Sequence, residues 1–573
     1  MATTPNKLSQ FWLELRHRKV LPFLIGYIAA CFAIIEFVLN ASETFSVPEN
    51  TIRLLYMLSA IGIPVVILLP WYINRKKTDT RAEETEKVES YTKLSIPQVQ
   101  EKSIIVLPFE NISPDPDQEY FSDGLTEEII TDLSFIDDLL VISRSSAMTF
   151  KGTKKTLKEV TKEVGVRYVL EGSVRKAGNN IRIVAQLIDG ADDSHIWAEK
   201  YNGTLEDIFD IQEKVSFSIA DALKIRFSEE TQQKITTHSF QDPDVYEIYL
   251  QARNENWKFT ESALNKGENL LKKGIKLVGD NELLYTELCH VNVQFVNNLL
   301  KNPGTYGELL SKANQYALKA VQANPSSALA YYARGIALYQ SCNPREAIGY
   351  WRKAIEIDPN HPEPMLFLMQ GFMYSMTGLD IKEAEVLLRK AGEMDPMNLL
   401  SKTSLGWRLF FEGKFQKAID EFADFQRQLE QFNSTFLLWF VWLNGLNRNY
   451  KEAFRLTDKL TNDHPKHIVS NLAQFIKYAW LNEKQEAMKY LNRDVEQAAW
   501  WDDGYSMMMA ECYSVLEEYD EAFKWLDRAI DYGLTNIPFL KEYDHFLDNL
   551  RSHYQFNSSL KRAGELLKSF ASN

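Results

Sequence analysis

A repeat of about 34 residues in the C-terminal half limits the fold of this chain more than any other feature. Pro325 and Pro359 are 34 residues apart, Pro396 follows 37 residues later, and Pro465 lies a further 69 residues on, or two periods. After Gln241 no strand pattern occurs, and the segments between these prolines read as pairs of amphipathic helices. Such a pair can bury its apolar face only against the next pair, so the repeats predict an all-α solenoid.

One unit shows the tetratricopeptide pattern most fully. Its first helix carries Tyr331, Gly335 and Leu338, its second carries Ala347, Trp351 and Ala354, and Pro359 closes it. Tyr331 stands where the pattern has Trp and Trp351 where it has Phe, while Arg334 at position seven departs from the pattern. We expect about eight units between Asp242 and Gly533, and helical repeats with a C-terminal cap over residues 241–573.

Residues 103–227 show the pattern of a small mixed α/β domain. Ser103–Phe109 is an apolar, β-branched run of strand type, and Asp123 is placed to cap a helix over Leu125–Leu133. Further elements are expected as a helix over 157–164 ending at Gly165, a hairpin of 173–176 with 181–188, a strand over 195–201 and a helix over 207–225.

The runs VLPFENIS, DPDQEYFSDGLTEEIITDLS, VRYVLEGSVRKAGNNIRIVAQLID and HIWAEKYNGTLEDIFDIQ resemble the TolB amino-terminal-like domain. The resemblance covers about Ser103 to Leu223. It implies a domain that lies, in many bacterial proteins, between a membrane segment and tetratricopeptide (TPR) repeats.

Two apolar runs of 20 residues each, Val20–Leu39 and Leu54–Ile73, precede this domain, and about 20 apolar residues span a bilayer. Basic residues flank them at 16–19 and at 75–77, so the positive-inside rule places both ends in the cytoplasm. The expected parts are a cytoplasmic segment over 1–19, two transmembrane helices within 20–77 (20–39 and 54–73) and a polar linker over 78–102.

The expected fold class is therefore multidomain: a transmembrane helical hairpin, a small α/β (TolB N-terminal-like) domain and then an all-α TPR solenoid. This organisation predicts a protein of the bacterial inner membrane whose soluble domains lie in the cytoplasm. A periplasmic placement, as for TolB itself, is the alternative.

Charge and motifs disfavour several function classes. The net charge of −14 argues against a broad nucleic-acid interface, and the four cysteines have no zinc spacing. No G-x-S-x-G motif, phosphate-binding G-x-x-x-x-G-K-[ST] loop or G-x-G-x-x-G motif occurs. Only nineteen residues precede the first expected span, which leaves no room for the cyclase, kinase or DNA-binding domain that relatives often carry.

Two polar clusters could suggest chemistry, and we interpret both as structural. The acidic residues 115, 117, 119 and 123 lack the EF-hand spacing, because Tyr120 and Thr126 stand where glycine and glutamate are required. His195 would share a strand face with Trp197 and Glu199, as sheet histidines commonly do. The sequence therefore predicts no catalytic residues, no metal and no cofactor.

The remaining candidate site is the concave face of the solenoid, formed by the first helix of each repeat. An aromatic, weakly charged groove favours an apolar or proline-containing segment, or an amphipathic helix. Packing between helices is the alternative for each aromatic residue. Replacement of Trp407 or Trp442 by alanine is expected to weaken partner capture and to leave stability nearly unchanged. The candidate residues are Tyr332, Ile336, Tyr339, Leu366, Gln370, Trp407, Phe410, Leu438 and Trp442.

The expected function is that of a membrane-anchored, non-enzymatic scaffold or signalling adaptor that binds protein or peptide partners through the TPR solenoid and the TolB-like domain. One alternative is an envelope component that faces the periplasm. Another is a sensor that binds a nucleotide or other small ligand in the α/β domain.

Overall fold

The computed structural model describes residue 57 and residues 100–571, without positions 137, 226–227, 237–239, 241, 362, 399–400, 402–403 and 430–433. Residues 97–573 form one of two compact units, and everything described below belongs to it.

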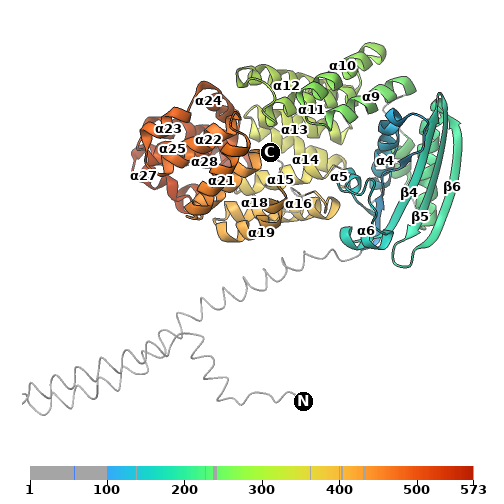
Figure 1. Cartoon of the computed structure of the whole chain (residues 1–573), viewed down its shortest axis with the longest axis horizontal. Helices are drawn as coiled ribbons and strands as arrows, with labels where there is room; N and C mark the ends of the chain where they lie inside the picture. The colour runs from blue at the N-terminus through green and yellow to red at the C-terminus, as the bar shows by residue number, and fades with distance from the viewer. Residues whose placement is uncertain are drawn as a thin grey trace, which may run out of the picture. The chain divides into compact units, whose positions relative to one another are not determined.

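A mixed β-sheet forms the N-terminal part of this unit (Figure 1). Its strands run in the order β3-β1-β4-β5-β6, and β2 also pairs with β4. β1 is parallel to β3 and β4, whereas β5 and β6 are antiparallel additions. The strands are β1 (Gln100–Val106), β2 (Glu110–Asn111), β3 (Leu140–Val141), β4 (Val166–Ala177), β5 (Asn180–Asp189) and β6 (Ser194–Thr204). β1 begins at Gln100, so residues 100–102 of the segment expected as a linker (78–102) belong to the sheet.

The period of two in β5 explains why this strand lies on a core. Ile181, Ile183, Ala185 and Leu187 are buried on one face, while the residues between them are more exposed. Helices α4 (Glu119–Ser134) and α7 (Ile208–Ala222) pack against each other and against the sheet, and the shorter α5 (Arg144–Met148) and α6 (Leu157–Val164) complete the layer.

The helix predicted over 157–164 is confirmed. Thr156 and Glu159 form a capping box at its start, and Gly165 ends it in the left-handed conformation with φ 75°. The predicted hairpin is also confirmed, since β4 and β5 pair directly as far as Ala177 and Asn180.

The predicted role of Asp123 as a helix cap is wrong. Helix α4 begins four residues earlier, after a short 3₁₀ turn (η2, Pro116–Gln118) in which Asp115 accepts a hydrogen bond from the Asp117 amide at 2.9 Å. Gly124 serves close packing and not a turn, because a Cβ there would lie 2.5 Å from Leu250. The carboxylate of Asp123 instead accepts a hydrogen bond from Lys151 at 2.6 Å.

Helices make up the rest of the unit. After α8 (Glu229–Thr236), successive helices pack in pairs, and eight such pairs follow one another among the described residues. The pairs are α9 (Pro243–Asn256) with α10 (Glu261–Val278), α11 (Glu282–Asn297) with α12 (Tyr306–Ala323), α13 (Ala328–Gln340) with α14 (Pro344–Ile357), α15 (Pro364–Thr377) with α16 (Ile381–Met394), α18 (Ser404–Phe411) with α19 (Phe415–Leu429), α20 (Ser434–Leu446) with α21 (Tyr450–Asp463), α22 (Ile468–Trp480) with α23 (Lys484–Tyr490), and α25 (Asp503–Val515) with α26 (Tyr519–Asp531). Shorter elements follow as α24 (Arg493–Trp500), between the last two pairs, and η5 (Phe539–Tyr543), η6 (His545–Leu547), α27 (Asp548–Arg551) and α28 (Tyr554–Ala571).

Small residues on the first helix of a pair allow the second helix to approach. At Gly335 a Cβ would lie 2.2 Å from the indole nitrogen of Trp351, and at Gly406 it would lie 2.7 Å from Phe422. Trp351 is fully buried and donates to the carbonyl of Tyr332 at 3.2 Å. The glycine and aromatic positions read from the sequence at Gly335 and Trp351 thus form the contact between α13 and α14.

The fold-class prediction requires a correction at its membrane hairpin. Across residues 100–571, with the gaps given above, no helix is both long and apolar enough to span a bilayer. The most apolar helices, α15 and α20, have only 14 and 13 residues, whereas a span needs about 20. Both predicted spans, 20–39 and 54–73, lie outside the described residues apart from Met57. The described architecture is an α/β domain joined to a helical solenoid.

The solenoid curves until its C-terminal helices touch its middle (Figure 1). Helix α28 packs on α26 and also on α14, where Arg352 donates to the carbonyl of Phe570 at 3.1 Å. The hydroxyl of Tyr532, just after α26, donates to the carbonyl of Gln340 at 3.4 Å. The tail that the sequence assigns to an end cap therefore also closes the array on itself.

Candidate functional site

The predicted concave-face residues all lie on first helices of the pairs, but most of them are buried. Tyr332 and Tyr339 are 5% exposed, and Trp442 is 1% exposed. Leu366, Gln370, Phe410 and Leu438 are also buried, whereas Ile336 and Trp407 are half-buried. The structure brings Trp407, Phe410 and Trp442 into one aromatic cluster, with Phe410 and Trp442 ring centroids 4.8 Å apart. Tyr332 and Tyr339 lie elsewhere on α13.

The segment after α26 covers part of this face. The hydroxyl of Thr535 donates to the carbonyl of Thr377 at 3.0 Å, and the amide of Asn536 donates to the carbonyls of Ser375 and Phe411 at 3.2 and 3.1 Å. These carbonyls belong to the last turns of α15 and α18, where no following turn of helix supplies a backbone N–H donor for them. The segment thus forms hydrogen bonds with two neighbouring repeats and covers part of their face.

Phe539 supplies the apolar part of this covering segment. Its ring is fully buried and lies 5.5 Å from Phe410 and 5.6 Å from Phe411, measured between centroids. At Gly413 a Cβ would lie 2.5 Å from Tyr543, so the same segment also fits tightly against the α18–α19 turn. A partner would reach Phe410 only after this segment had left.

Two buried carboxyl clusters close the face further. The indole nitrogen of Trp442 donates to both carboxylate oxygens of Glu511, at 2.7 and 2.8 Å, and the charge of the buried Asp544 acts on Glu511. Burial and the neighbouring carboxylate raise the pKa of Glu511, and burial raises the pKa of Asp544 to about 6. The pair therefore retains a proton well above the usual range of carboxyl groups.

The second cluster joins α13 to α25. The hydroxyl of Tyr339 donates to Asp503 at 2.9 Å, next to Asp502. Burial raises the pKa of both carboxyl groups, that of Asp502 to about 7. Both clusters connect the C-terminal repeats to the middle of the array. A cavity of about 510 Å³ is lined in part by Tyr543 and His545, the sequence neighbours of Asp544 in the first cluster.

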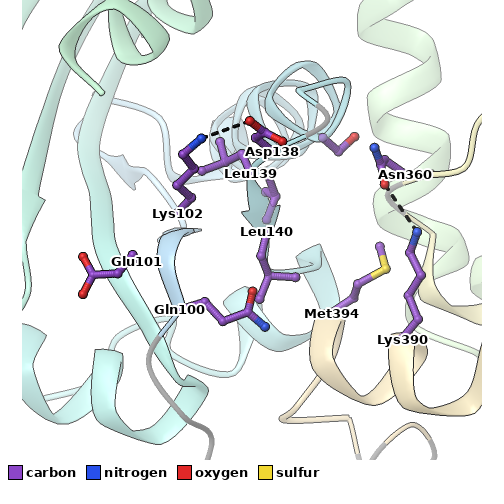
Figure 2. A pocket seen from close by; sticks show the side chains of 11 residues that line it. Gln100, Glu101, Lys102, Asp138, Leu139, Leu140, Asn360, Lys390 and Met394 are labelled. Carbon is purple, nitrogen blue, oxygen red and sulfur yellow. Dashed lines mark hydrogen bonds and ion pairs between the residues drawn. The ribbon is translucent and has the colours of Figure 1, made fainter. Parts of the chain in front are cut away.

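A cavity of about 340 Å³ lies where the α/β domain meets the array (Figure 2). β1, β3 and the end of α4 form one wall, and α16 with the turn before α15 forms the other. Lys102 pairs with Asp138 at 3.0 Å, and Lys390 donates to the carbonyl of Pro359 and to Asn360. Because these charged groups already have partners, the cavity presents few free polar groups to a ligand.

Beside this cavity, α5 is bonded to the end of α16. The hydroxyls of Ser143 and Ser146 both donate to one oxygen of Asp395 at 2.6 Å, and all three side chains are buried. The amide of Ser143 donates to the carbonyl of Met394 at 2.8 Å, and the amide of Met397 donates back to Ser146 at 2.9 Å. The sequence separation of about 250 residues is the reason that sequence reasoning missed this contact.

A second junction joins α4 to the first repeats. Arg253 on α9 pairs with Glu127 at 2.5 Å and with Glu287 on α11 at 3.4 Å, while Arg144 pairs with Glu127 at 3.2 Å. The buried Arg253 guanidinium lies beside Glu287 and holds the pKa of that carboxyl at about 2, against the effect of burial. Together the two junctions hold the α/β domain and the array as one body.

The polar clusters noted in the sequence have structural partners or lie on the surface. Glu119 and Asp123 both pair with Lys151 at 2.6 Å, and Asp115 caps η2. His195 lies exposed on β6. Within the described ranges no group of three or more His, Cys, Asp or Glu side chains could hold a metal ion.

The sheet ends at one covered edge and one open edge. β3 is a two-residue edge strand, followed directly by the Ser143 contacts with the array. β6 is eleven residues long, pairs only with β5 among the described strands and is mostly exposed (Figure 1). The open edge is the largest unpaired backbone surface that the described sheet offers.

Comparisons with known proteins match two parts of the chain. Residues 100–217 match the family model "HilA/YgeH-like transcriptional regulator, second domain", and residues 328–361 match the tetratricopeptide repeat model. The second match coincides with α13 and α14 and shows that this pair is a TPR repeat. The first match covers the region of the predicted TolB resemblance and does not confirm that resemblance.

A curated relative from Rhizobium meliloti (strain 1021), "Putative adenylate cyclase 3", is 36% identical over 237 residues. These residues are 41% of this chain and 40% of the relative, so the match spans well under half of either protein.

Solved structures align only weakly. TolB from Acinetobacter baumannii aligns with a TM-score of 0.17 and 21% identity, over 22% of this chain and 30% of that chain. Yeast Tom70 aligns with a TM-score of 0.31 and 15% identity, over 62% of this chain and 82% of that chain.

Proposed function

We propose that this protein is a non-enzymatic scaffold that binds protein partners through the outer surfaces of one rigid body. The observation that supports this most directly is the run of eight helix pairs with a TPR match at residues 328–361. Solenoids of this kind present extended surfaces and few enclosed cavities, which suits protein contacts better than small substrates.

The partner surface in this proposal lies away from the predicted concave residues. Phe410 and Trp442 are buried by the chain's own C-terminal part, so contacts there would need the array to open. Large apolar side chains on the outside of the array are accessible instead. Leu277 and Val386 are both 58% exposed, and Tyr554 is 77% exposed.

The absence of catalysis is part of the proposal and is supported by the structural contacts of three buried acids with shifted pKa values. Glu511 accepts a hydrogen bond from Trp442, and Asp503 accepts one from Tyr339. Glu287 forms an ion pair with Arg253, and all three contacts lie inside the packed body. Their pKa shifts follow from burial and neighbouring charges, which structural networks also produce.

The role of a signalling adaptor is the finer part of the proposal. It is favoured by the curated relative, whose name is that of an enzyme that makes a second messenger. We propose that the shared 237 residues provide contact surfaces in this chain, and that the chain forms no cyclic AMP.

A reducing compartment is the proposed location of the described part. Cys289, Cys342 and Cys512 are free thiols, and burial raises the pKa of Cys342 to about 11 and that of Cys289 to about 12. Protonated thiols in packed surroundings are stable under such conditions.

Site-specific photo-crosslinking in cells tests the scaffold proposal. A photoreactive phenylalanine analogue placed at Leu277, Val386 or Tyr554 of the full chain should give protein adducts at one or more of these positions. The same analogue at the fully buried Phe410 should give none, provided that this variant keeps the unfolding temperature of the parent. Absence of adducts at every exposed position would contradict the scaffold.

A turnover assay tests the non-enzymatic part. The purified full chain, incubated with ATP and Mg²⁺ or Mn²⁺, should release no cyclic AMP. Cyclic AMP formation that one substitution within residues 100–225 abolishes would contradict the proposal.

A further inference from the structure

The open edge of the sheet has two sides of different chemistry. Burial on β5 identifies the helix-covered side, because Leu187 and Ile183 are buried there and pair with Trp197 and Tyr201 of β6. Trp197 and Tyr201 are only half-buried, although their β5 partners are fully buried. A further strand beside β6 would cover these two rings and complete that side of the layer.

The other side of the sheet is basic near this edge. Arg175 on β4 and Arg182 on β5 are directly opposite each other, and Asn202 on β6 extends the same row. Lys200 pairs with Val184 in the next row and therefore points to the same side. All three cationic residues are exposed. Like charges directly across a strand pair are unfavourable, and a bound anionic group would relieve this repulsion.

Nearby acids on this side have other contacts or lie further away. Glu171 accepts a hydrogen bond from Gln186, with which it shares a row. Glu110 lies on β2, beyond β4 from the open edge. Glu206, near the hairpin turn, accepts from Asn179 at 2.8 and 3.0 Å. On this side of the sheet the positive charge is therefore concentrated where a strand added to β6 would lie. Glu199 of β6 lies on the opposite, helix-covered side between Trp197 and Tyr201, and it accepts a hydrogen bond from the Tyr201 hydroxyl at 2.9 Å.

The edge itself can accept a strand. The eleven residues of β6 provide about 36 Å of backbone, at about 3.3 Å per residue. A bulge at Ile196, between the pairs of Ile188 with His195 and Leu187 with Trp197, protects only the first part of the strand. A lysine on an edge strand discourages most pairings, and the same charge favours a strand that carries carboxylates.

We infer that β6 is a docking edge for an extended acidic segment of a partner protein, which pairs with residues 197–204 as an added strand. Its acidic side chains face Lys200 and Arg182, and its alternate, apolar side chains cover Trp197 and Tyr201. This inference deepens the proposed function and rests on it, since it assigns one surface of the scaffold and the chemistry of its partner.

A second copy of the chain is a poorer occupant. A two-fold axis relates identical surfaces, so antiparallel pairing of two β6 edges in one sheet places the basic side of one copy next to the basic side of the other. Arg175, Arg182 and Lys200 of the two copies would then repel one another across the new interface.

Binding of synthetic peptides to the full chain tests the inference. The probe is a fluorescent nine-residue peptide of alternating valine and glutamate. Its controls are the valine–lysine peptide and a valine–glutamate peptide N-methylated at every second amide, which lacks the donors for strand pairing. The valine–glutamate peptide should bind, with affinity that falls as salt is raised, and both controls should bind at least about tenfold more weakly.

Variants and hydrogen exchange locate the peptide. Lys200→Glu and Arg182→Glu should each weaken binding about tenfold, whereas Lys417→Glu, an exposed charge reversal on α19, should leave it unchanged. The bound peptide should slow amide exchange within residues 194–204. Circular dichroism checks that the two sheet variants remain folded.

Four outcomes would overturn the inference: no binding of the valine–glutamate peptide, equal binding of the lysine peptide, no effect of either sheet variant, or exchange protection outside 194–204. Dimerisation of the chain alone with protection of β6 would also overturn it, in favour of a second copy. Failure here with adducts in the crosslinking experiment leaves the scaffold proposal intact, whereas absence of adducts contradicts the scaffold independently of the peptide result.

Discussion

Trp442 shows how a residue's surroundings change the interpretation of its type. In the sequence it is an aromatic residue at a position that faces the groove of a TPR array. In the structure its ring is 1% exposed, and its nitrogen donates to both oxygens of Glu511. An aromatic residue that satisfies a buried carboxyl group is part of the core, and its removal would leave that group without its donor.

We therefore expect Trp442→Ala to be strongly destabilising, contrary to the expectation from the sequence. Loss of a buried tryptophan costs about 3–5 kcal/mol, and the half-buried Trp407 should cost less when replaced in the same way. Thermal and urea unfolding of the two variants measure this. Unchanged unfolding of Trp442→Ala would restore its original assignment to a partner surface.

The Glu511–Asp544 pair predicts a dependence of stability on pH. Their pKa values are raised in the folded state, so the folded protein holds more protons than the unfolded chain above about pH 4. The contribution of the pair to stability is complete below the unfolded pKa values and is lost as pH rises through the folded values, which is about 6 for Asp544. His361 and His545, with pKa values lowered to about 4 by burial, act in the opposite sense, because their contribution is lost as pH falls.

Glu511→Gln isolates the effect of the carboxyl pair. Glutamine keeps an acceptor for Trp442 and removes one titrating group, so the variant should lose less stability than the parent between pH 5 and pH 8. Urea unfolding at intervals of one pH unit measures the difference, in which the two histidines cancel. Parallel pH profiles for the variant and the parent would show that the pair does not titrate in this range.

At the scale of an element, the pair of α13 and α14 depends on one close contact. Gly335 on α13 lies against Trp351 on α14, whereas Gly349, on α14 of the same pair, has no atom within 4 Å of the position of a Cβ. Two glycines of one repeat are thus in opposite situations, and the difference comes from packing and not from helix propensity.

Alanine at the two glycines should therefore have opposite effects. Gly335→Ala should destabilise by about 1–3 kcal/mol, because the added carbon overlaps the indole of Trp351. Gly349→Ala should stabilise by up to about 1 kcal/mol, since it only restricts the unfolded chain and improves helix propensity. Denaturant unfolding of both variants gives the comparison, and effects of the same sign would contradict this account of the pair.

At the scale of the whole molecule, the α/β domain and the array are joined through buried contacts. Asp395, at the end of α16, accepts from Ser143 and Ser146 across about 250 residues of sequence. Buried hydrogen bonds of this kind make two modules unfold as one, because separation would leave the carboxylate without partners.

Asp395→Ala should uncouple the two parts. We expect calorimetry to resolve two unfolding transitions where the parent shows one, and amide exchange to accelerate at residues 140–147. The control is Asp380→Ala, which removes the cap at the other end of α16, where Asp380 accepts from the amides of Lys382 and Glu383. The control should lower stability without splitting the transition. A single transition in both variants would show that other contacts, such as Glu127 with Arg253, maintain the coupling.

Local patterns in the sequence determined the elements. Gly165 ends a helix because it adopts a positive φ, and Ala177–Asn180 form a turn because glycine and asparagine favour one. The proline period and the small–large positions of α13 and α14 identified the repeat, since these depend on neighbours within one pair. The prediction of a helix cap at Asp123 was wrong because it read Gly124 as part of a turn. Gly124 is instead needed inside the helix for close contact with Leu250, which is far away in the sequence.

Only the tertiary structure decided which surfaces are free. Phe539 fills the face that the repeat pattern exposes, Asp395 joins α16 to the α/β domain, and β6 remains the open edge of the sheet. The first two outcomes depend on how the helix pairs stack and bring distant segments together, and the third depends on the strand order of the sheet. The repeat in the sequence determines how each helix pair packs against the next pair. It does not determine where the last pairs lie, because their position depends on the small rotation between neighbouring pairs added over the whole array.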